Sequence, residues 1–153
     1  MTVFAIDPGT TESAYVQWDS VQRKILLMNI RPNTELLSFM SWRLRPKTDV
    51  IAIEMVASYG MPVGKEVFET VLWIGRFYER SEKEPLLVYR RDVKLHHCGN
   101  ARAKDANIRQ ALIDKYGAPG TKREPGLTYG LKSHLWSAFA LATFVSETQT
   151  EKI

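Results

Sequence analysis

Two acidic residues each close a short apolar run, and together they could hold a metal ion. Asp7 follows the run at residues 3–6, and Glu54 follows the run at residues 50–53. Wholly apolar runs of this length are typical of buried strands, and ligands of open α/β sheets bind beyond the carboxyl ends of such strands. A carboxylate there is costly to desolvate without a partner, and a divalent cation is a common partner. Either acid alone is more simply explained by a turn or by the end of a strand.

The residues after Asp7 suggest a second chemical role for this part of the chain. Residues 7–11 read Asp-Pro-Gly-Thr-Thr, an acid followed by a tight turn with a glycine and two hydroxyls. Proline and glycine directly after an apolar run end a strand. A backbone without bulk at this point can come close to a phosphate. The pattern therefore favours a phosphate-bearing ligand beside Asp7.

The elements that must position these residues follow from the hydrophobic pattern. The sequence predicts strands over residues 3–6, 13–18, 24–30, 50–53 and 86–89. It predicts helices over residues 33–44, 64–80, 105–116 and 131–145, with a shorter one at 91–98. Three consecutive strands followed by alternating helices and strands indicate one α/β domain over residues 1–153, with a five-stranded mixed sheet flanked by helices.

Two details of these helices can be predicted from residue types. Asn33 or Thr34 is a candidate N-cap for the first helix, because a short polar side chain can accept a bond from the free amides there. The helix over residues 64–80 should bury one apolar face. Its predicted members are Val67, Val71, Ile74 and Tyr78.

Four stretches of the chain resemble the RuvC-type Holliday-junction resolvases of the RNase H-like superfamily, and most of all the phage-type members. The first is Asp-Pro-Gly-Thr at residues 7–10. The second is Ala-Ile-Glu at 52–54, with a helix ending Trp-Ile-Gly-Arg at 73–76. The third joins Asp-Val-Lys at 92–94 to the basic turn and helix start at 99–108, and the fourth is residues 130–142. The stretches fall in the family's order and cover nearly the whole chain.

The resemblance implies four catalytic positions. Asp7 and Glu54 match the first two acids of the family, and His134 stands where the third acid is found and where some members carry histidine. Asp7, Glu54 and His134 are therefore the expected metal ligands. Ser137 stands where a fourth acid, an aspartate, is usual. Positions three apart lie on one face of a helix, so His134 and Ser137 are expected to point at the same site.

Ser137 is the departure from the family pattern that matters most. A serine hydroxyl is neutral and replaces a carboxylate on Mg²⁺ poorly. Three consequences stay open. His134 could act mainly as the proton acceptor for the attacking water. One metal ion could be bound weakly or held largely by substrate phosphate. Cutting could also be impaired, which would leave a protein that binds junctions.

The resemblance also implies the reaction and the assembly. The expected cofactor is Mg²⁺, with Mn²⁺ as a substitute, as two ions about 4 Å apart that clamp the scissile phosphate. No small-molecule cofactor is expected. The expected reaction is paired nicking of a four-way DNA junction, leaving 5′-phosphate ends, in DNA recombination and repair. Family members act as homodimers, so that two sites cut symmetric strands. Phe68, Trp73 or Phe77 could form the interface, or could equally belong to the core.

Basic and aromatic residues are the candidates for DNA contact. The net charge of +4 is weak evidence alone. The cluster of basic residues between Arg90 and Arg109 is denser and could bind phosphates without reading sequence. The DNA-binding candidates are Lys94, Arg102, Lys104, Arg109 and Lys132, with Lys122 and Arg123 in addition. Tyr59, or less strongly Met61, could stack on a base at the junction centre.

The cysteine content and the hydrophobic pattern indicate the cellular compartment of the protein. A single cysteine, Cys98, cannot form an internal disulfide, which favours a reducing compartment. The first residues do not resemble a signal peptide, and no apolar stretch reaches the roughly 18 residues that span a membrane. The expected location is the cytoplasm of a bacterial cell, with a phage gene as an alternative source, and no membrane partner is expected.

Two other functions stay open at this stage. The first is a broader nuclease for forks, flaps or RNA–DNA hybrids, because selectivity for DNA shape would lie in the geometry of a dimer. The second is a junction-binding protein with an impaired metal site. The reason to consider it is Ser137, which stands where the family has an aspartate.

Overall fold

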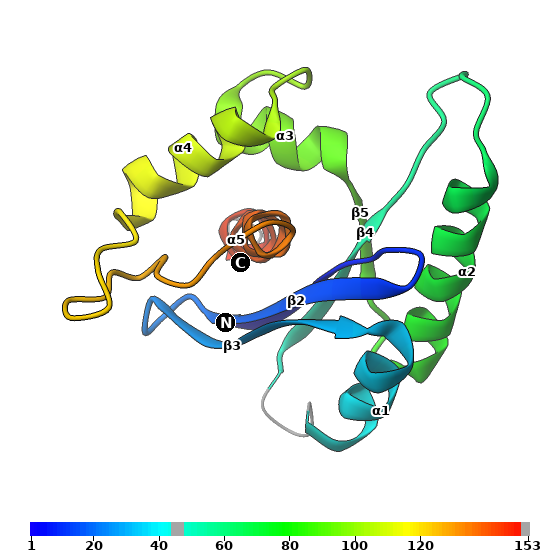
Figure 1. Cartoon of the computed structure of the whole chain (residues 1–153), viewed down its shortest axis with the longest axis horizontal. Coiled ribbons are helices and arrows are strands. Elements are labelled where there is room, and N and C mark those ends of the chain that lie inside the picture. Colours follow the sequence, from blue (N-terminus) through cyan, green and yellow to red (C-terminus); the bar gives the residue numbers. More distant parts are fainter. Residues whose placement is uncertain (44–47, 151–153) are drawn as a thin grey trace.

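The computed structural model describes residues 1–43 and 48–150, and its centre is a five-stranded mixed sheet (Figure 1). The strands are β1 (Thr2–Asp7), β2 (Glu12–Asp19), β3 (Lys24–Pro32), β4 (Val50–Met55) and β5 (Leu86–Tyr89). Their order in the sheet is β3-β2-β1-β4-β5. β1 pairs with β2, and β2 with β3, in antiparallel fashion, whereas β4 is parallel to both β1 and β5. The predicted mixed sheet is confirmed.

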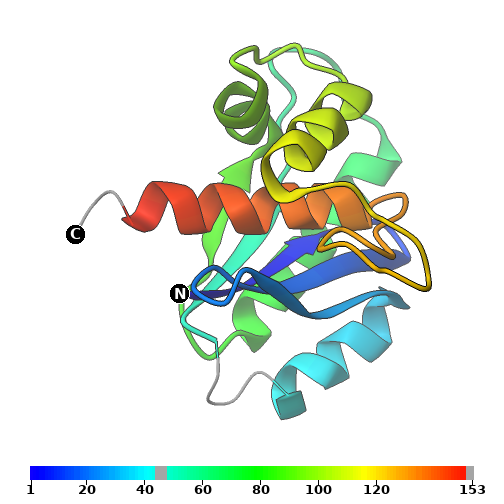
Figure 2. The same cartoon turned by 90° about the vertical axis from the view of Figure 1, so that its left-hand side faces the viewer.

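Five helices cover the two faces of the sheet. They are α1 (Asn33–Arg43), α2 (Lys65–Arg80), α3 (Arg90–Cys98), α4 (Asp105–Tyr116) and α5 (Leu135–Thr150). α1 and α2 lie on one face, and α5 runs across the other face with α3 and α4 outside it (Figures 1 and 2). α5 is therefore enclosed between the sheet and two helices, which explains why its sequence is apolar nearly all round.

The alternation of side chains along β1 and β4 decides where the two acids point. Val3 and Ala5 belong to the core beneath α5, whereas Phe4 and Ile6 belong to the core beneath α1 and α2. Successive side chains of a strand point to opposite faces, so Asp7 continues the face of α5. On β4, Ala52 lies in the α5 core, and Glu54 shares its face by the same alternation.

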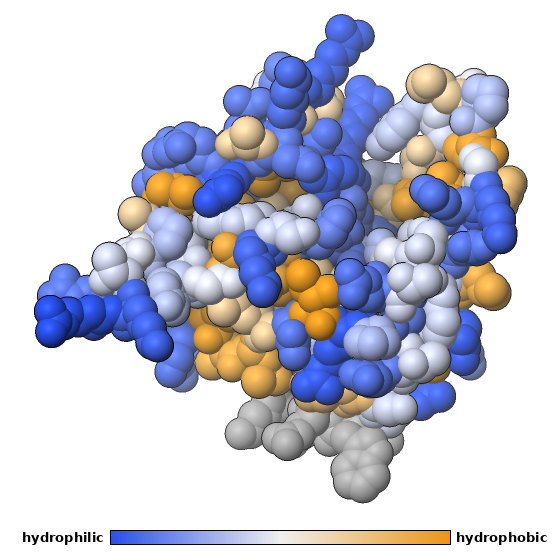
Figure 3. All heavy atoms as spheres, viewed as in Figure 1, coloured by the Kyte–Doolittle hydropathy of each residue, from blue (hydrophilic) through white to orange (hydrophobic). Residues whose placement is uncertain are grey.

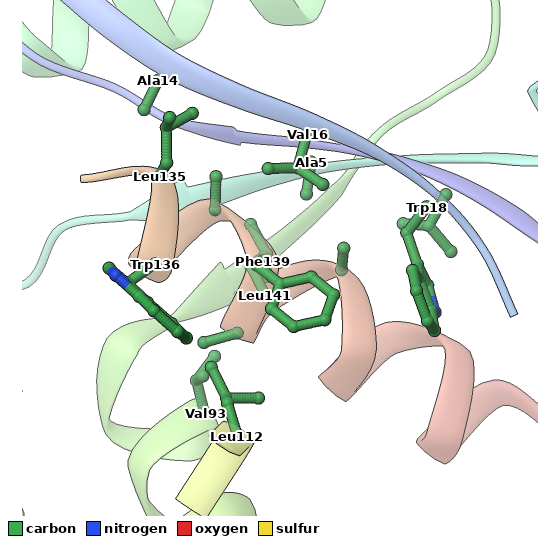
Figure 4. Packing of buried hydrophobic residues seen from close by; sticks show 14 of the residues in the cluster. Ala5, Ala14, Val16, Trp18, Val93, Leu112, Leu135, Trp136, Phe139 and Leu141 are labelled. Atoms are coloured by element: carbon green, nitrogen blue, oxygen red, sulfur yellow. The ribbon is translucent and has the colours of Figure 1, made fainter. Parts of the chain in front are cut away.

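The core around α5 fixes the position of that helix. Trp136, Phe139 and Leu141 are buried among residues of the sheet, of α3 and of α4 (Figure 4). These three side chains therefore belong to the core.

The start of the last helix differs from the prediction. The helix begins at Leu135 rather than at residue 131 and continues to Thr150. Gly130 and Ser133 have φ values of 86° and 50°, which a right-handed helix does not accept. His134 therefore precedes the helix, and its carbonyl accepts the amide of Ala138 at 3.0 Å. His134 is thus not part of the helix that carries Ser137, but both residues line the same hollow, as expected of two residues that point at one site.

The buried face of α2 also differs from the prediction. Thr70, Ile74 and Phe77 are buried, whereas Val71 is exposed. Apolar residues lie around most of this helix, so the sequence offers more than one apolar stripe, and packing against the sheet selects between them. Within the described residues, no helix is long and apolar enough to cross a membrane.

Candidate active site

The turn that carries Asp7 is held by a network of hydrogen bonds. The amide of Gly9 donates to Ser13 Oγ at 3.1 Å, and Asn33 Nδ2 donates to the Gly9 carbonyl at 2.9 Å. Ser13 Oγ in turn donates to Asn33 Oδ1 at 2.5 Å. Asn33 was predicted as a candidate helix cap, but its buried side chain fastens this turn instead. Sequence reasoning missed Ser13 and Asn33 because their partners lie on distant segments.

Gly9 is required in this turn by the space around it. A Cβ atom built on Gly9 would lie 2.3 Å from the backbone oxygen of Glu12, far inside contact distance. The turn can therefore close this tightly only with glycine at this position.

Asp7 and His134 are in direct contact, as the sequence predicted for two members of one site. The Nδ1 atom of His134 lies 2.9 Å from Asp7 Oδ2. The Asp7 side chain is 12% exposed, whereas the His134 side chain is 75% exposed. The hydrogen bond to Asp7 raises the pKa of His134 above its usual value. With a carboxylate as its partner, Nδ1 carries the proton, which leaves Nε2 as an acceptor.

Glu54 lies at the carboxyl end of the neighbouring strand. Ile6 and Ile53 are partners in the parallel pair, so the residues that follow them, Asp7 and Glu54, meet at one edge of the sheet. The Glu54 side chain is 13% exposed. Burial, and then the charge of Asp7, raise the pKa of Glu54 to about 7, against the opposing effect of Arg90. Two carboxylates in a desolvated site repel each other, and a bound cation would relieve that repulsion.

Arg90 contacts three other side chains of the site. Its Nη1 atom lies 3.5 Å from both carboxylate oxygens of Glu54 and donates to Ser137 Oγ at 3.2 Å. Its Nη2 atom pairs with Asp105 Oδ1. Burial alone would lower the pKa of Arg90, but Glu54, and then Asp105 and Asp7, raise it above its usual value.

Arg90 and Asp105 are site residues that sequence reasoning did not identify. The sequence marks Arg90 only as the start of a basic cluster, and Asp105 only as the first residue of a predicted helix. The pairing of β4 with β5 explains how Arg90 reaches the site. Val88 on β5 pairs with Glu54, so alternation carries Arg90, two residues later, to the same face beyond the end of the strand.

Two hollows meet at His134. The larger has a volume of about 520 Å³, and its lining includes Arg90, Asp105, Arg109, His134 and Ser137. The smaller has a volume of about 260 Å³ and is lined by Asp7, residues 8–12 and His134, among others. The larger is within the usual range for ligand pockets.

The other predicted DNA-binding residues lie on segments around these hollows. Arg109 lines the larger hollow, where its guanidinium lies 5.1 Å from the centre of the Trp136 ring. Lys94 is half-buried on α3, and exposed residues at the turns before α4 and α5 are Arg102, Lys104 and Lys132. Figure 3 shows hydrophilic side chains over α3 and its turn into α4, and at the far left over the α4–α5 loop, which carries Lys122 and Arg123.

The loop between β4 and α2 presents the predicted aromatic residue. Tyr59 is exposed and has a φ of 49°, and Gly60 follows with a φ of 80°. The Met61 amide donates to the Ser58 carbonyl at 2.9 Å, which closes the turn. A non-glycine residue in this left-handed conformation costs about 1–2 kcal/mol, so the turn holds Tyr59 outward against a local preference.

The raised pKa of Glu54 predicts a specific pH dependence of stability. Between the unfolded pKa of 4.5 and the folded value of about 7, the folded protein binds more protons than the unfolded chain, so stability falls as pH rises through this window. Glu54→Gln removes this loss. The stability of the variant relative to the wild type should therefore rise between pH 4.5 and pH 8, by up to on the order of 3 kcal/mol. Urea unfolding in EDTA at the two pH values measures the difference, and an equal difference at both would contradict this account.

Comparison with known proteins supports the fold alone. No protein-family model and no curated protein sequence matches the chain. RuvC from Thermus thermophilus is similar in structure, with 17% identity, a TM-score of 0.67 and coverage of 98% of each chain. T. thermophilus RuvC in complex with a Holliday junction substrate is also similar, with 16% identity, a TM-score of 0.70 and coverage of 99% of this chain and 96% of that one. The predicted RNase H-like fold of the RuvC type is confirmed.

Proposed function

We propose that the protein is a metal-dependent endonuclease that resolves four-way DNA junctions. The observation that carries the proposal is the contact of Asp7 with His134, with Glu54 at the end of the neighbouring strand, at one edge of a RuvC-type sheet. Similarity to a RuvC bound to a Holliday junction supports branched DNA as the substrate class. The finer likeness to phage-type members, the single domain over residues 1–153 and the cytoplasmic location remain predictions.

The chemistry of the donor set fits a divalent cation such as Mg²⁺ or Mn²⁺. Asp7 and Glu54 offer carboxylate oxygens, which are the ligands that these ions prefer. His134 has one free ring nitrogen, because Nδ1 is bonded to Asp7, and we assign that nitrogen to proton transfer rather than to the ion. The carboxylates are largely buried, and repulsion between them favours a cation. A bound ion would supply charge neutralisation at a phosphodiester and make water easier to deprotonate.

The protein's own residues would position the substrate and move the proton. His134, held through Nδ1 by Asp7, keeps Nε2 available to accept a proton from the attacking water. Residues 8–12 line the smaller hollow together with Asp7 and His134, so a phosphate in that hollow would lie against the backbone of this turn. Arg109 lines the larger hollow and would bind a phosphate there. The other proposed phosphate contacts are Lys94, Arg102, Lys104 and Lys132. Tyr59 would stack on a base at the junction centre.

The test is cleavage of four labelled substrates of matched sequence: a four-way junction, a fork, a flap and a linear duplex. We expect paired nicks in the junction, in Mg²⁺ or Mn²⁺, that carry 5′-phosphates and can be religated. Equal cutting of the fork, the flap and the junction would instead support the broader nuclease. Tight junction binding without cutting in either metal would support a binding protein, the alternative that the neutral Ser137 favours.

A homodimer through α2 completes the proposal. Phe68 and Leu72 are each 65% exposed and lie one helical turn apart, beside the exposed Val71. Figure 3 shows hydrophobic atoms along the right-hand edge, over α2. Exposed apolar stripes of this kind mark interaction surfaces. Phe77 is fully buried and belongs to the core instead, and Trp73 is half-buried against it.

Substituting the centre of this stripe should separate the subunits. We expect Leu72→Asp to convert a dimer of two 17.5 kDa chains into monomers, as measured by light scattering, and to turn paired nicks into single uncoordinated nicks. Val21→Asp is the matched control, since Val21 is exposed in the turn between β2 and β3. A wild-type protein that is monomeric at micromolar concentration would contradict the dimer.

A further inference from the structure

The guanidinium of Arg90 lies among the groups that surround the metal ligands. It contacts both oxygens of Glu54, the hydroxyl of Ser137 and the carboxylate of Asp105. The side chain is only partly exposed, and it reaches these groups from the first residue of α3, directly after β5. A positive charge is thus built into the site between Glu54 and the start of α5.

The residue at position 137 is neutral and contacts the Arg90 guanidinium. In the family that the chain resembles, an aspartate is usual there, and a carboxylate could help to hold a second metal ion. Ser137 adds no charge, and its hydroxyl oxygen accepts an N–H of Arg90 instead. A guanidinium cannot lose its proton in a protein, so its charge is permanent.

Arg90 also opens onto the space where a substrate would lie. It lines the larger hollow together with His134 and Arg109. A guanidinium presents five N–H donors in a planar fork that fits phosphate oxygens, so donors remain for a substrate beyond those that contact protein groups.

Resting on the proposed nuclease function, we infer that Arg90 supplies the positive charge that a second metal ion would supply, so the site takes one divalent ion. That ion belongs with Asp7 and Glu54, whose carboxylates lie at the ends of neighbouring strands. Arg90 acts on the phosphate at the side of the leaving group. Water bonds to phosphorus while the bond from phosphorus to the 3′ oxygen breaks. His134 takes one proton of the water, and the departing 3′ oxygen is paired with Arg90 and takes a proton from solvent.

The test titrates the metal-free protein with Mn²⁺ alone and follows the number of bound ions by calorimetry and by electron paramagnetic resonance. We expect one Mn²⁺ per chain for the wild type and for Arg90→Gln. We expect two for the double variant Arg90→Gln with Ser137→Asp, which removes the guanidinium and restores the acid. Two ions per wild-type chain would overturn the inference. If the wild type bound no Mn²⁺ and cut no DNA, the proposed function itself would fail.

The rate of junction cleavage distinguishes two roles of Arg90: one in which it takes part in catalysis, and one in which it only occupies the place of a second metal ion. We expect Arg90→Gln to lower single-turnover cleavage by about 10²–10³-fold while keeping its one Mn²⁺ and its junction binding. Arg90→Lys, which keeps a cation, should recover part of that loss. Arg80→Gln changes an exposed arginine at the end of α2, outside the basic cluster, and serves as the control. An Arg90→Gln protein that cuts as fast as the wild type, or faster, would overturn the inference.

Discussion

Asp7→Asn should abolish junction cleavage, with a loss of at least about 10³-fold in the single-turnover rate. Asp7 is the residue that touches His134 and adjoins Glu54, so its charge serves both the proposed metal ion and the proposed proton acceptor. Asparagine keeps the shape of the side chain but removes that charge. Junction binding, measured by fluorescence anisotropy in EDTA, should stay within a few-fold of the wild type, because the proposed phosphate contacts are basic residues elsewhere.

A second readout makes this prediction independent of activity. Asp7 raises the pKa of His134, so in Asp7→Asn that pKa should fall back toward its ordinary value, which a nuclear magnetic resonance titration of the ring measures. Asp114→Asn makes the same chemical change at an exposed position of α4 and serves as the control. If Asp7→Asn cleaved the junction at a rate within tenfold of the wild type, the assignment of Asp7 to the catalytic site would be wrong.

Gly9→Ala should lower the cleavage rate by about 10²-fold without touching any catalytic side chain. The added methyl group would collide with the backbone oxygen of Glu12, so the turn must open. The bonds that Ser13 and Asn33 make to Gly9 would then be strained, and Asp7 at the base of the turn would shift. A displacement of about 1 Å in a reacting geometry can cost this much rate.

Gly64→Ala is the matched control, because nothing lies within 4 Å of the Cβ that it adds. Single-turnover cleavage and thermal melting of both variants measure the effect. Overpacking at Gly9 should also cost about 1–3 kcal/mol of stability, whereas Gly64→Ala should melt close to the wild type. If both variants cleaved the junction equally well, the tight conformation of the Gly9 turn would not be required for cleavage.

Asp7 and Glu54 could be found from the sequence because local rules place them. Each follows an apolar run, and the alternation of a strand carries both to one face. His134 was found by resemblance. The helix that was expected to carry it begins at Leu135, directly after His134. That error arose because the apolar pattern of α5 extends backwards through Leu131, while positive φ values at Gly130 and Ser133 interrupt the helix.

Arg90 could not be found in this way, because its role depends on pairing between distant segments. It reaches the site only because β5 lies beside β4, and an arginine after a strand is otherwise most simply a surface charge. The turn residues Ser13 and Asn33 pose the same difficulty. Their hydrogen bonds join β2 and the start of α1 to the loop after β1, and no periodicity in the sequence reports such contacts.

The contact between Asp7 and His134 joins residues 127 positions apart in the chain, which has a consequence for synthesis. The antiparallel strands β1, β2 and β3 are neighbours in sequence and can pair while the ribosome is still making the rest. The second acid arrives with β4, and the histidine arrives only with the turn before α5. Contacts of such long sequence separation form late in folding. The proposed site therefore cannot assemble in a nascent chain until residue 134 has emerged from the ribosome.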